Sequence, residues 1–176
     1  MNKKDLRTFI RLQKGMFTPQ QLDEQSAEII RRLLAHPRIK NADCVLMYYS
    51  LDDEVNTREA VDLLVKQGKR VLLPAVISET EMELRCYEGP QDLEGGFFNI
   101  MEPVGKAFSN YEEIDVAVIP GMAFDGRCNR LGRGRGYYDR LLSRLPQTYK
   151  IGICFDFQRL PGIPADEHDI KVDEII

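Results

Sequence analysis

The sequence lacks several features that would assign a protein class at once. It contains no apolar run of about 18 residues, the length that a membrane span requires. The N-terminal stretch MNKKDLRTFIRLQKG has neither the apolar segment nor the small-residue cleavage site of a secretory signal. The four cysteines are far apart and form no C-x-x-C pair, which argues against a zinc site or a redox motif. We therefore expect a cytoplasmic protein without a membrane span.

The charge balance gives little support to a polymeric anion as partner. The 176 residues include 24 lysines and arginines and 28 aspartates and glutamates, for a formal net charge of −4. Such a balance does not suit nucleic acid or an anionic membrane. The segment 125–140 is an exception, because it contains five arginines and only two aspartates. A local positive site on an acidic protein favours a small anionic ligand.

The hydrophobic pattern predicts an α/β fold. Continuous apolar runs, typical of strands buried on both faces, alternate with helical periodicity along the chain. The predicted strands cover residues 44–50, 70–76, 82–88 (an edge strand), 113–121, 150–156 and 171–176. The predicted helices cover residues 3–14, 19–34, 56–68 and 137–145. We expect a single domain over 1–176, with a mainly parallel sheet sandwiched between helix layers. The stretch 78–110 is the least regular and is interpreted as an insertion or a flap.

The most unusual segment is LGRGRGYYDR, residues 131–140, which leads into a predicted helix. Glycine lets backbone N–H groups approach an anion, arginine donates to phosphate or carboxylate oxygens, and a helix N-terminus favours negative charge. The spacing matches neither the Walker pattern nor the G-x-G-x-x-G that directly follows a strand. The segment therefore predicts an anion-binding loop of unspecified ligand. The alternative is a surface loop whose arginines face water.

Several charged residues remain ambiguous on the pattern alone. Asp139, in the first turn of the predicted helix, either complements the helix dipole or binds Mg²⁺. The acidic turn 52–54 is either solvated or binds an amine or N–H donor at a strand end. His168 is a turn residue or a ligand. The basic stripe on the first helix is by default a solvated face, and it consists of Lys3, Arg7, Arg11 and Lys14.

The run PGMAFDGRCNRLGRGRGYYDRLL, residues 120–142, resembles the signature of the 5-formyltetrahydrofolate cyclo-ligases, also called 5,10-methenyltetrahydrofolate synthetases. The similarity extends to KKDLR near the start, MYYSLDDEVNT, the pair Glu102-Pro103, and HDIKVDEI near the end. It spans nearly the whole chain and is thinnest over 78–110.

The resemblance implies an enzyme that uses ATP and Mg²⁺. It would cyclise 5-formyltetrahydrofolate to 5,10-methenyltetrahydrofolate, releasing ADP and phosphate, through phosphorylation of the formyl oxygen. Its partners would be a reduced folate and ATP, without nucleic acid or membrane, and the protein would be a monomer. The alternatives are a non-catalytic folate- or nucleotide-binding regulatory protein on the same fold and, less favoured, a different ATP-dependent kinase or ligase.

The resemblance also implies the site residues. The catalytic residues would be Arg133, Arg135 and Tyr137. ATP would be bound by Lys3, Lys4, Arg7, Arg130, Leu131, Gly132, Arg133, Gly134, Arg135, Gly136, Tyr137 and Tyr138. The folate would be bound by Tyr49, Glu54, Arg133 and Tyr137, and the metal by Asp139 and Asp169. Many family members have glycine at the position of Arg135, so Arg133 is the firmer assignment.

Overall fold

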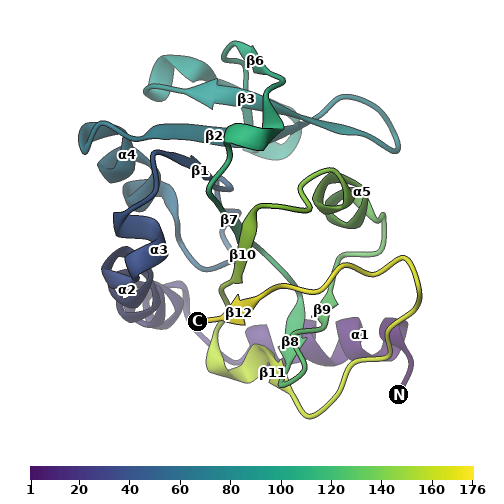
Figure 1. Cartoon of the computed structure of the whole chain (residues 1–176). Helices are drawn as coiled ribbons and strands as arrows, with labels where there is room; N and C mark the ends of the chain where they lie inside the picture. Colours follow the sequence, from purple (N-terminus) through teal and green to yellow (C-terminus); the bar gives the residue numbers. More distant parts are fainter.

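A computed structural model describes residues 1–176, except for the side chain of Asn99. A seven-stranded sheet with strand order β12-β10-β7-β1-β2-β3-β6 forms its centre (Figure 1). Strands β12, β10, β7, β1 and β2 are parallel, whereas β3 and β6 add antiparallel pairs at one side. The strands of this sheet are β1 (Cys44–Leu46), β2 (Arg70–Val76), β3 (Met82–Tyr87), β6 (Ala107–Phe108), β7 (Val116–Ile119), β10 (Tyr149–Gly152) and β12 (Glu174–Ile175).

The remaining elements are helices and two small sheets. The helices are α1 (Lys3–Lys14), α2 (Pro19–Ala35), α3 (Pro37–Lys40), α4 (Arg58–Lys66) and α5 (Tyr137–Ser143), with short 3-10 turns η1 (Pro90–Asp92), η2 (Phe97–Asn99), η3 (Tyr111–Glu113) and η4 (Asp156–Gln158). The small sheets are the three-stranded β11 (Arg159–Leu160), β8 (Ala123–Asp125) and β9 (Arg130–Leu131), and the hairpin β4 (Leu93–Gly95) and β5 (Met101–Pro103). Within the described part of the chain, none of the helices has the length and apolar character needed to cross a membrane.

The apolar strands are buried on both faces, as their continuous hydrophobic runs predict. In β7, Val116 and Val118 pack in the cluster that includes α2, α3 and α4, whereas Ala117 and Ile119 pack in the cluster that includes α5. Side chains alternate between the two faces of a strand, so each face needs its own apolar layer. The predicted α/β fold, with a mainly parallel sheet between helix layers, is confirmed.

Helix α1 covers the small three-stranded sheet (Figure 1). Leu6 and Ile10 on its apolar face pack with Ala123 of β8 and Leu131 of β9. The helix begins with a capping box, in which the Asn2 side chain accepts a hydrogen bond from the Asp5 backbone N–H at 2.9 Å. This packing places Arg7 of α1 beside the glycine- and arginine-rich segment, whereas Lys4 and Arg11 are exposed.

The predicted strands 113–121, 150–156 and 171–176 are shorter in the structure, where they form β7, β10 and β12. Two further strand predictions differ in other ways. The run 44–50 forms strand only as far as Leu46, because the chain then turns. Thr57 fixes that turn by donating to the Tyr48 carbonyl (2.5 Å) and accepting from the Ser50 N–H (3.2 Å). The prediction of β3 as an edge strand is wrong, because β6 pairs with it. The stretch 78–110 thus belongs partly to the main sheet.

Candidate active site

A cavity of about 950 Å³ lies at the carboxyl ends of the parallel strands. Its walls include Tyr48 after β1, Pro74 in β2 and Pro120 after β7. Ligands of open α/β sheets bind in this region of the fold. Most of the predicted site residues line this cavity, namely Lys3, Arg7, Tyr49, Glu54, Arg130, Gly132, Arg133, Gly134, Arg135, Gly136, Tyr137, Tyr138, Asp139 and Asp169.

Two of the predicted ATP-binding residues do not line the cavity. Lys4 is exposed, because consecutive helical residues point about 100° apart and its neighbour Lys3 takes the inward position. The Leu131 side chain is 1% exposed and packs with Leu6 in the core under α1. Its carbonyl accepts a hydrogen bond from the Met122 N–H at 2.7 Å. Leu131 therefore anchors the loop from the core, whereas Lys4 faces away from the cavity.

The loop that precedes α5 depends on two glycines in the left-handed region. Gly134 has φ +111° and Gly136 has φ +71°, values that side chains with a Cβ adopt at a cost. The Arg7 guanidinium donates from Nε to the Gly132 carbonyl at 2.7 Å and so ties α1 to the loop. The contact with Arg7 fixes the loop against α1, and its glycines line the cavity.

Arg130 is a buried cation beneath this loop. It is 8% exposed, its guanidinium donates to the Pro120 carbonyl at 3.0 Å, and it lies 5.3 Å from the centre of the Tyr138 ring. Burial lowers the pKa of Arg130, and the nearby charge of Asp139, 3.9 Å away, opposes that shift. Its Nε has no hydrogen-bond partner among the described residues. Arg130 therefore brings a largely desolvated positive charge to the cavity wall.

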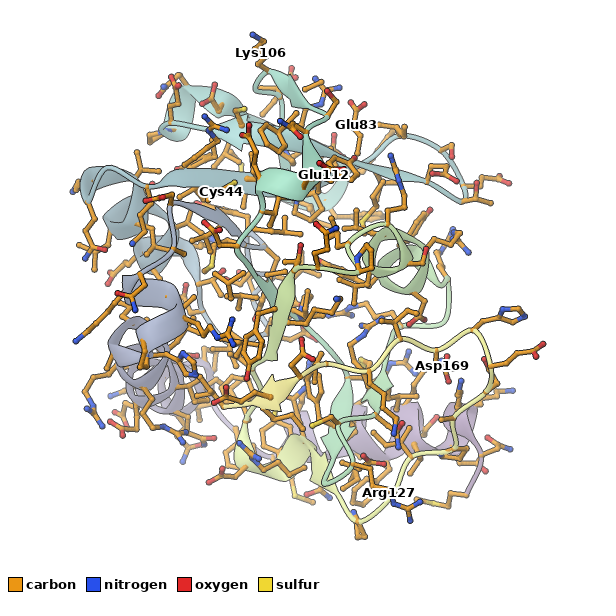
Figure 2. The ribbon with its side chains drawn as sticks, viewed as in Figure 1. Cys44, Glu83, Lys106, Glu112, Arg127 and Asp169 are labelled. Carbon is orange, nitrogen blue, oxygen red and sulfur yellow. The ribbon has the colours of Figure 1, made fainter. Side chains whose placement is uncertain are left out.

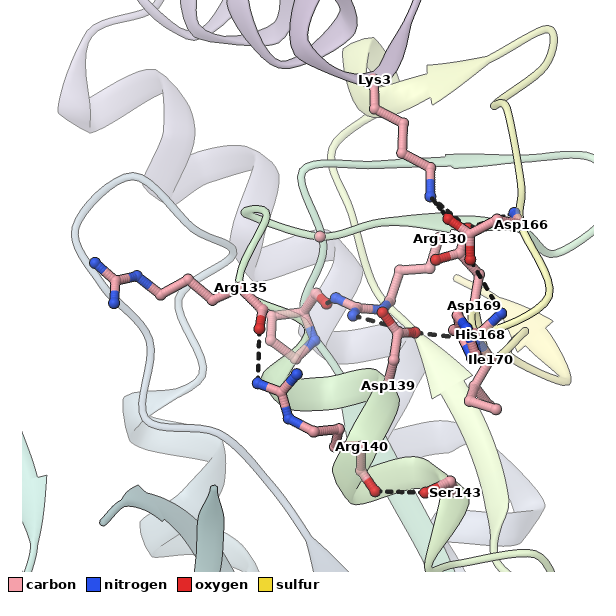
Figure 3. Close-up of polar contacts among 12 residues, drawn as sticks. Lys3, Arg130, Arg135, Asp139, Arg140, Ser143, Asp166, His168, Asp169 and Ile170 are labelled. Carbon is pink, nitrogen blue, oxygen red and sulfur yellow. Dashed lines mark hydrogen bonds and ion pairs between the residues drawn. The ribbon is translucent and has the colours of Figure 1, made fainter. Parts of the chain in front are cut away.

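Arg133 lies directly beside two carboxylates. Its Nη2 lies 3.3 Å from Asp53 Oδ1 and 3.5 Å from Glu54 Oε2. Burial raises the pKa of Glu54, although the hydrogen bond from the Leu51 N–H (2.8 Å) and the Arg133 charge oppose this shift. The guanidinium of Arg135 is exposed and has no partner among the described residues, and its side chain extends away from Asp139 (Figure 3). The two loop arginines thus have different surroundings.

The two predicted metal ligands lie on opposite sides of one small polar cluster (Figure 3). Asp139 Oδ1 accepts from the Ile170 N–H at 3.0 Å. Asp169 Oδ2 accepts from Lys3 Nζ at 2.5 Å and from the Asp166 N–H at 2.9 Å. The second oxygen of each carboxylate makes no hydrogen bond within the described residues.

This donor set suits a metal ion that is held mainly by phosphate. The described residues contain no group of three or more His, Cys, Asp or Glu side chains that would hold a metal by themselves. Mg²⁺ bound to a nucleotide usually takes only one or two protein carboxylates and completes its octahedron with phosphate and water. Two carboxylates with one free oxygen each fit that requirement.

The irregular stretch 78–110 contributes to the cavity in a way that its sequence does not reveal. Met82, Met101 and Pro103 line the wall, and the Tyr137 hydroxyl donates to the Ser78 carbonyl at 3.1 Å. At the other end of the chain, residues 166–169 also reach the wall, and Asp166, His168 and Asp169 line it. The ambiguous His168 thus lies at the cavity, although its side chain is 86% exposed and faces Glu167. No local periodicity could have indicated these contacts.

Arg127 belongs to the positive segment 125–140 but not to the site. It is exposed in the turn between β8 and β9 and does not line the cavity. Figure 2 shows it well apart from Asp169, on the far end of that turn. The arginines of 125–140 therefore do not all belong to one site.

The fold and the cavity define a class of α/β enzymes in which an arginine- and glycine-rich loop lies at the carboxyl ends of a mainly parallel sheet. The model of the 5-formyltetrahydrofolate cyclo-ligase family matches residues 1–176, and the chain belongs to that family. Members of this family are ligases of folate metabolism that use ATP as co-substrate.

Individual relatives agree with the family match. The probable 5-formyltetrahydrofolate cyclo-ligase of Schizosaccharomyces pombe is 31% identical, over 100% of this chain and 95% of that protein. The 5-formyltetrahydrofolate cyclo-ligase of mouse is 30% identical, over 99% and 92%. The NMR structure of Aquifex aeolicus 5,10-methenyltetrahydrofolate synthetase superposes with a TM-score of 0.86 at 34% identity, covering 99% of this chain and 89% of that one.

Proposed function

We propose that this enzyme phosphorylates the formyl oxygen of 5-formyltetrahydrofolate with ATP and then closes the ring to 5,10-methenyltetrahydrofolate. One observation carries the proposal. A single cavity is lined by the cationic groups Lys3, Arg7 and Arg133 and by the partly buried acceptor Glu54. The cations suit the phosphates of ATP, and the carboxylate suits the N–H donors of a reduced pterin.

The chemistry requires activation of a poor leaving group. The formyl oxygen attacks the γ-phosphorus, and the bond from that phosphorus to ADP breaks. The N10 nitrogen then attacks the formyl carbon, the C–O bond breaks, and phosphate leaves with the oxygen. Loss of the N10 proton completes the methenyl bridge. Phosphoryl transfer of this kind depends on positioning and on neutralisation of charge rather than on a protein nucleophile.

The residues of the cavity are assigned roles in that scheme. Arg133 neutralises the transferring phosphoryl group, and Lys3 and Arg7 bind the other phosphates. Glu54 accepts from the folate, and Tyr49 packs beside it. Tyr137, at the start of α5, closes the site between folate and nucleotide.

Asp139 and Asp169 would hold Mg²⁺, which supplies additional positive charge to the phosphate oxygens when it is bound. Lys3 Nζ lies 2.5 Å from Asp169 Oδ2 and pairs with that carboxylate. We further propose that the chain acts as one domain, because its charged site residues line one cavity, and that it acts as a monomer.

The test follows ATP hydrolysis and the absorbance of the methenyl product, with and without 5-formyltetrahydrofolate and Mg²⁺. We expect ADP and methenyl product in equal amounts, only when both additions are present. Arg133→Ala is expected to lower kcat by about 10²-fold or more, as the loss of a charge-stabilising donor does. Arg127→Ala is the matched control, because this exposed arginine of the same segment does not line the cavity.

Two results would contradict the proposal. ATP turnover that does not respond to the folate would favour a different kinase or ligase. Binding of both ligands without product would favour the regulatory protein considered from the sequence.

A further inference from the structure

Lys14 is a buried cation that none of the proposed roles uses. It is 8% exposed at the end of α1, and its Nζ lies 3.2 Å from Asp53 Oδ2. Neither Lys14 nor Asp53 lines the cavity. A lysine is almost never buried to this degree without a pairing partner, and here the partner is a residue that also binds the main arginine of the site.

The contacts form a continuous series of alternating charges. Lys14 pairs with Oδ2 of Asp53, and Oδ1 of the same carboxylate faces Arg133 at 3.3 Å. Arg133 then faces Glu54 at 3.5 Å. Two cations and two anions thus balance, and Asp53 divides its interaction between a buried ammonium and a half-exposed guanidinium.

This arrangement determines how firmly Arg133 is held. A ligand phosphate that binds Arg133 must compete with Asp53 and Glu54 for the same guanidinium. Lys14 weakens that competition, because it neutralises much of the Asp53 charge from the side that the cavity does not reach. Burial by itself would raise the pKa of Asp53, and the charges of Lys14 and Arg133 lower it instead, so the carboxylate stays ionised between them.

We propose that Lys14 is a positioning residue that acts through Asp53 to keep Arg133 available to the anionic ligand of the cavity. The inference rests on the proposed function only in assigning Arg133 to the phosphates of ATP. Without Lys14, Asp53 directs its full charge to Arg133, and the guanidinium is held against the two carboxylates. The cavity also loses one positive charge from its surroundings.

The experiment measures the dissociation constant of Mg–ATP by calorimetry, which needs no turnover, in the full-length protein and its variants. We expect Lys14→Met to weaken binding about tenfold, the size found for coupled charged groups in contact. Lys14→Arg keeps the charge and the donor and should stay within about threefold of the parent protein. The double variant Lys14→Met/Asp53→Asn removes the competing charge together with its partner and should recover most of the affinity.

The double variant distinguishes a positioning role of Lys14 from a purely structural one. A lysine that only stabilised the core would give thermal melts that fall in both Lys14→Met and the double variant, and the second substitution would not restore binding. Unchanged affinity in Lys14→Met, or a double variant as weak as the single one, would overturn the inference. If the parent protein binds Mg–ATP and shows this pattern but makes no methenyl product, the proposed function fails and the role of Lys14 stands.

Discussion

Asp53 and Glu54 are adjacent carboxylates that respond to opposite influences. Lys14 and Arg133 lower the pKa of Asp53 against the effect of burial, whereas burial dominates at Glu54 and raises its pKa. The difference follows from position, because the Asp53 side chain is 50% exposed between two cations and that of Glu54 is 14% exposed with a single cation. Glu54 is thus a mostly buried carboxylate at the cavity with one charged neighbour at 3.5 Å, which suits a group that also accepts from a ligand.

The raised pKa of Glu54 gives a pH-dependent prediction. A carboxyl whose folded-state pKa is raised contributes stability below its unfolded pKa, near 4.5, and loses that contribution as pH rises through the folded value. Glu54→Gln should therefore melt at a higher temperature than the parent protein at pH 7 to 8, and the two melting curves should converge as pH falls toward 4.5. The same variant should bind the folate more weakly, because it loses the charged acceptor.

Calorimetric melts over this pH range and folate titrations at neutral pH provide the measurement. Glu88→Gln is the matched control, since this glutamate is exposed after β3 and should change neither quantity. A Glu54→Gln variant that is less stable than the parent at pH 8 would show that the pairing with Arg133 outweighs the cost of burial.

At the residue scale, the sequence predicts the residues of the loop 130–136 and of the start of α5 better than the residues that contact them. Arg133, Tyr137 and Asp139 are close together in the chain, and a local motif is enough to select them. Lys14 and Asp53 are 39 positions apart, and only tertiary packing brings them together. The basic stripe of α1 was identifiable from its helical spacing, but which of its members turn inward was not.

At the scale of elements, the loop 130–136 depends on its glycines. Gly134→Ala places a Cβ at φ +111°, and the strain should cost about 1–2 kcal/mol. For a domain of this size we expect a melting temperature lower by about 2–8 °C, together with a loss of turnover because the loop changes course. Thermal melts and kcat/KM measure the two effects.

Gly126→Ala is the control for this substitution. Gly126 lies in the β8–β9 turn of the same segment, its φ is not in the left-handed region, and an added Cβ would meet no atom within 4 Å. It should leave activity and stability nearly unchanged. Equal behaviour of the two variants would mean that the backbone conformation of Gly134 does not matter for the site.

The elements that the sequence predicts well are those with local signals. Helices α1 and α2 agree with the prediction because capping residues and a period of 3.6 mark both. Strands β6, β8, β9 and β11 are two or three residues long, too short for an alternating pattern to reveal. The partners of β6 and β11 also lie far along the chain, as in the pairing of β11 with β8, so these two strands depend on the tertiary fold, whereas β8 and β9 pair with each other across a short turn.

At the scale of the whole molecule, the parallel sheet brings together segments from both ends of the chain. Lys3 and Asp169, 166 positions apart, meet at the cavity that the strand ends form. The formal charge of −4 is therefore a poor guide to the local field, because several cationic side chains line the same cavity. An anionic ligand that bridges these segments should stabilise the molecule as a unit, since it binds only where both are folded.

This linkage gives a prediction for the metal. ATP at about 100 times its dissociation constant should stabilise the protein by about 2.7 kcal/mol, which corresponds to roughly 5–11 °C in melting temperature. Mg²⁺ alone should give almost no shift, because the described residues provide no group of three donors for it. Mg²⁺ and ATP together should exceed ATP alone, because the metal adds carboxylate contacts to those of the phosphates.

Asp139→Asn tests where that additional shift arises. In the parent protein, Asp139 Oδ1 accepts from the Ile170 N–H at 3.0 Å, and the amide oxygen of asparagine can accept the same hydrogen bond. The fold should therefore be preserved while the negative charge is lost. We expect the shift with ATP alone to persist and the extra shift with Mg²⁺ to shrink. Asp23→Asn, on the exposed side of α2, should retain both shifts. If Mg²⁺ raised the melting temperature of Asp139→Asn as much as that of the parent protein, Asp139 would be a helix-dipole residue and not a metal ligand. A strong shift with Mg²⁺ alone would require donors other than these two carboxylates.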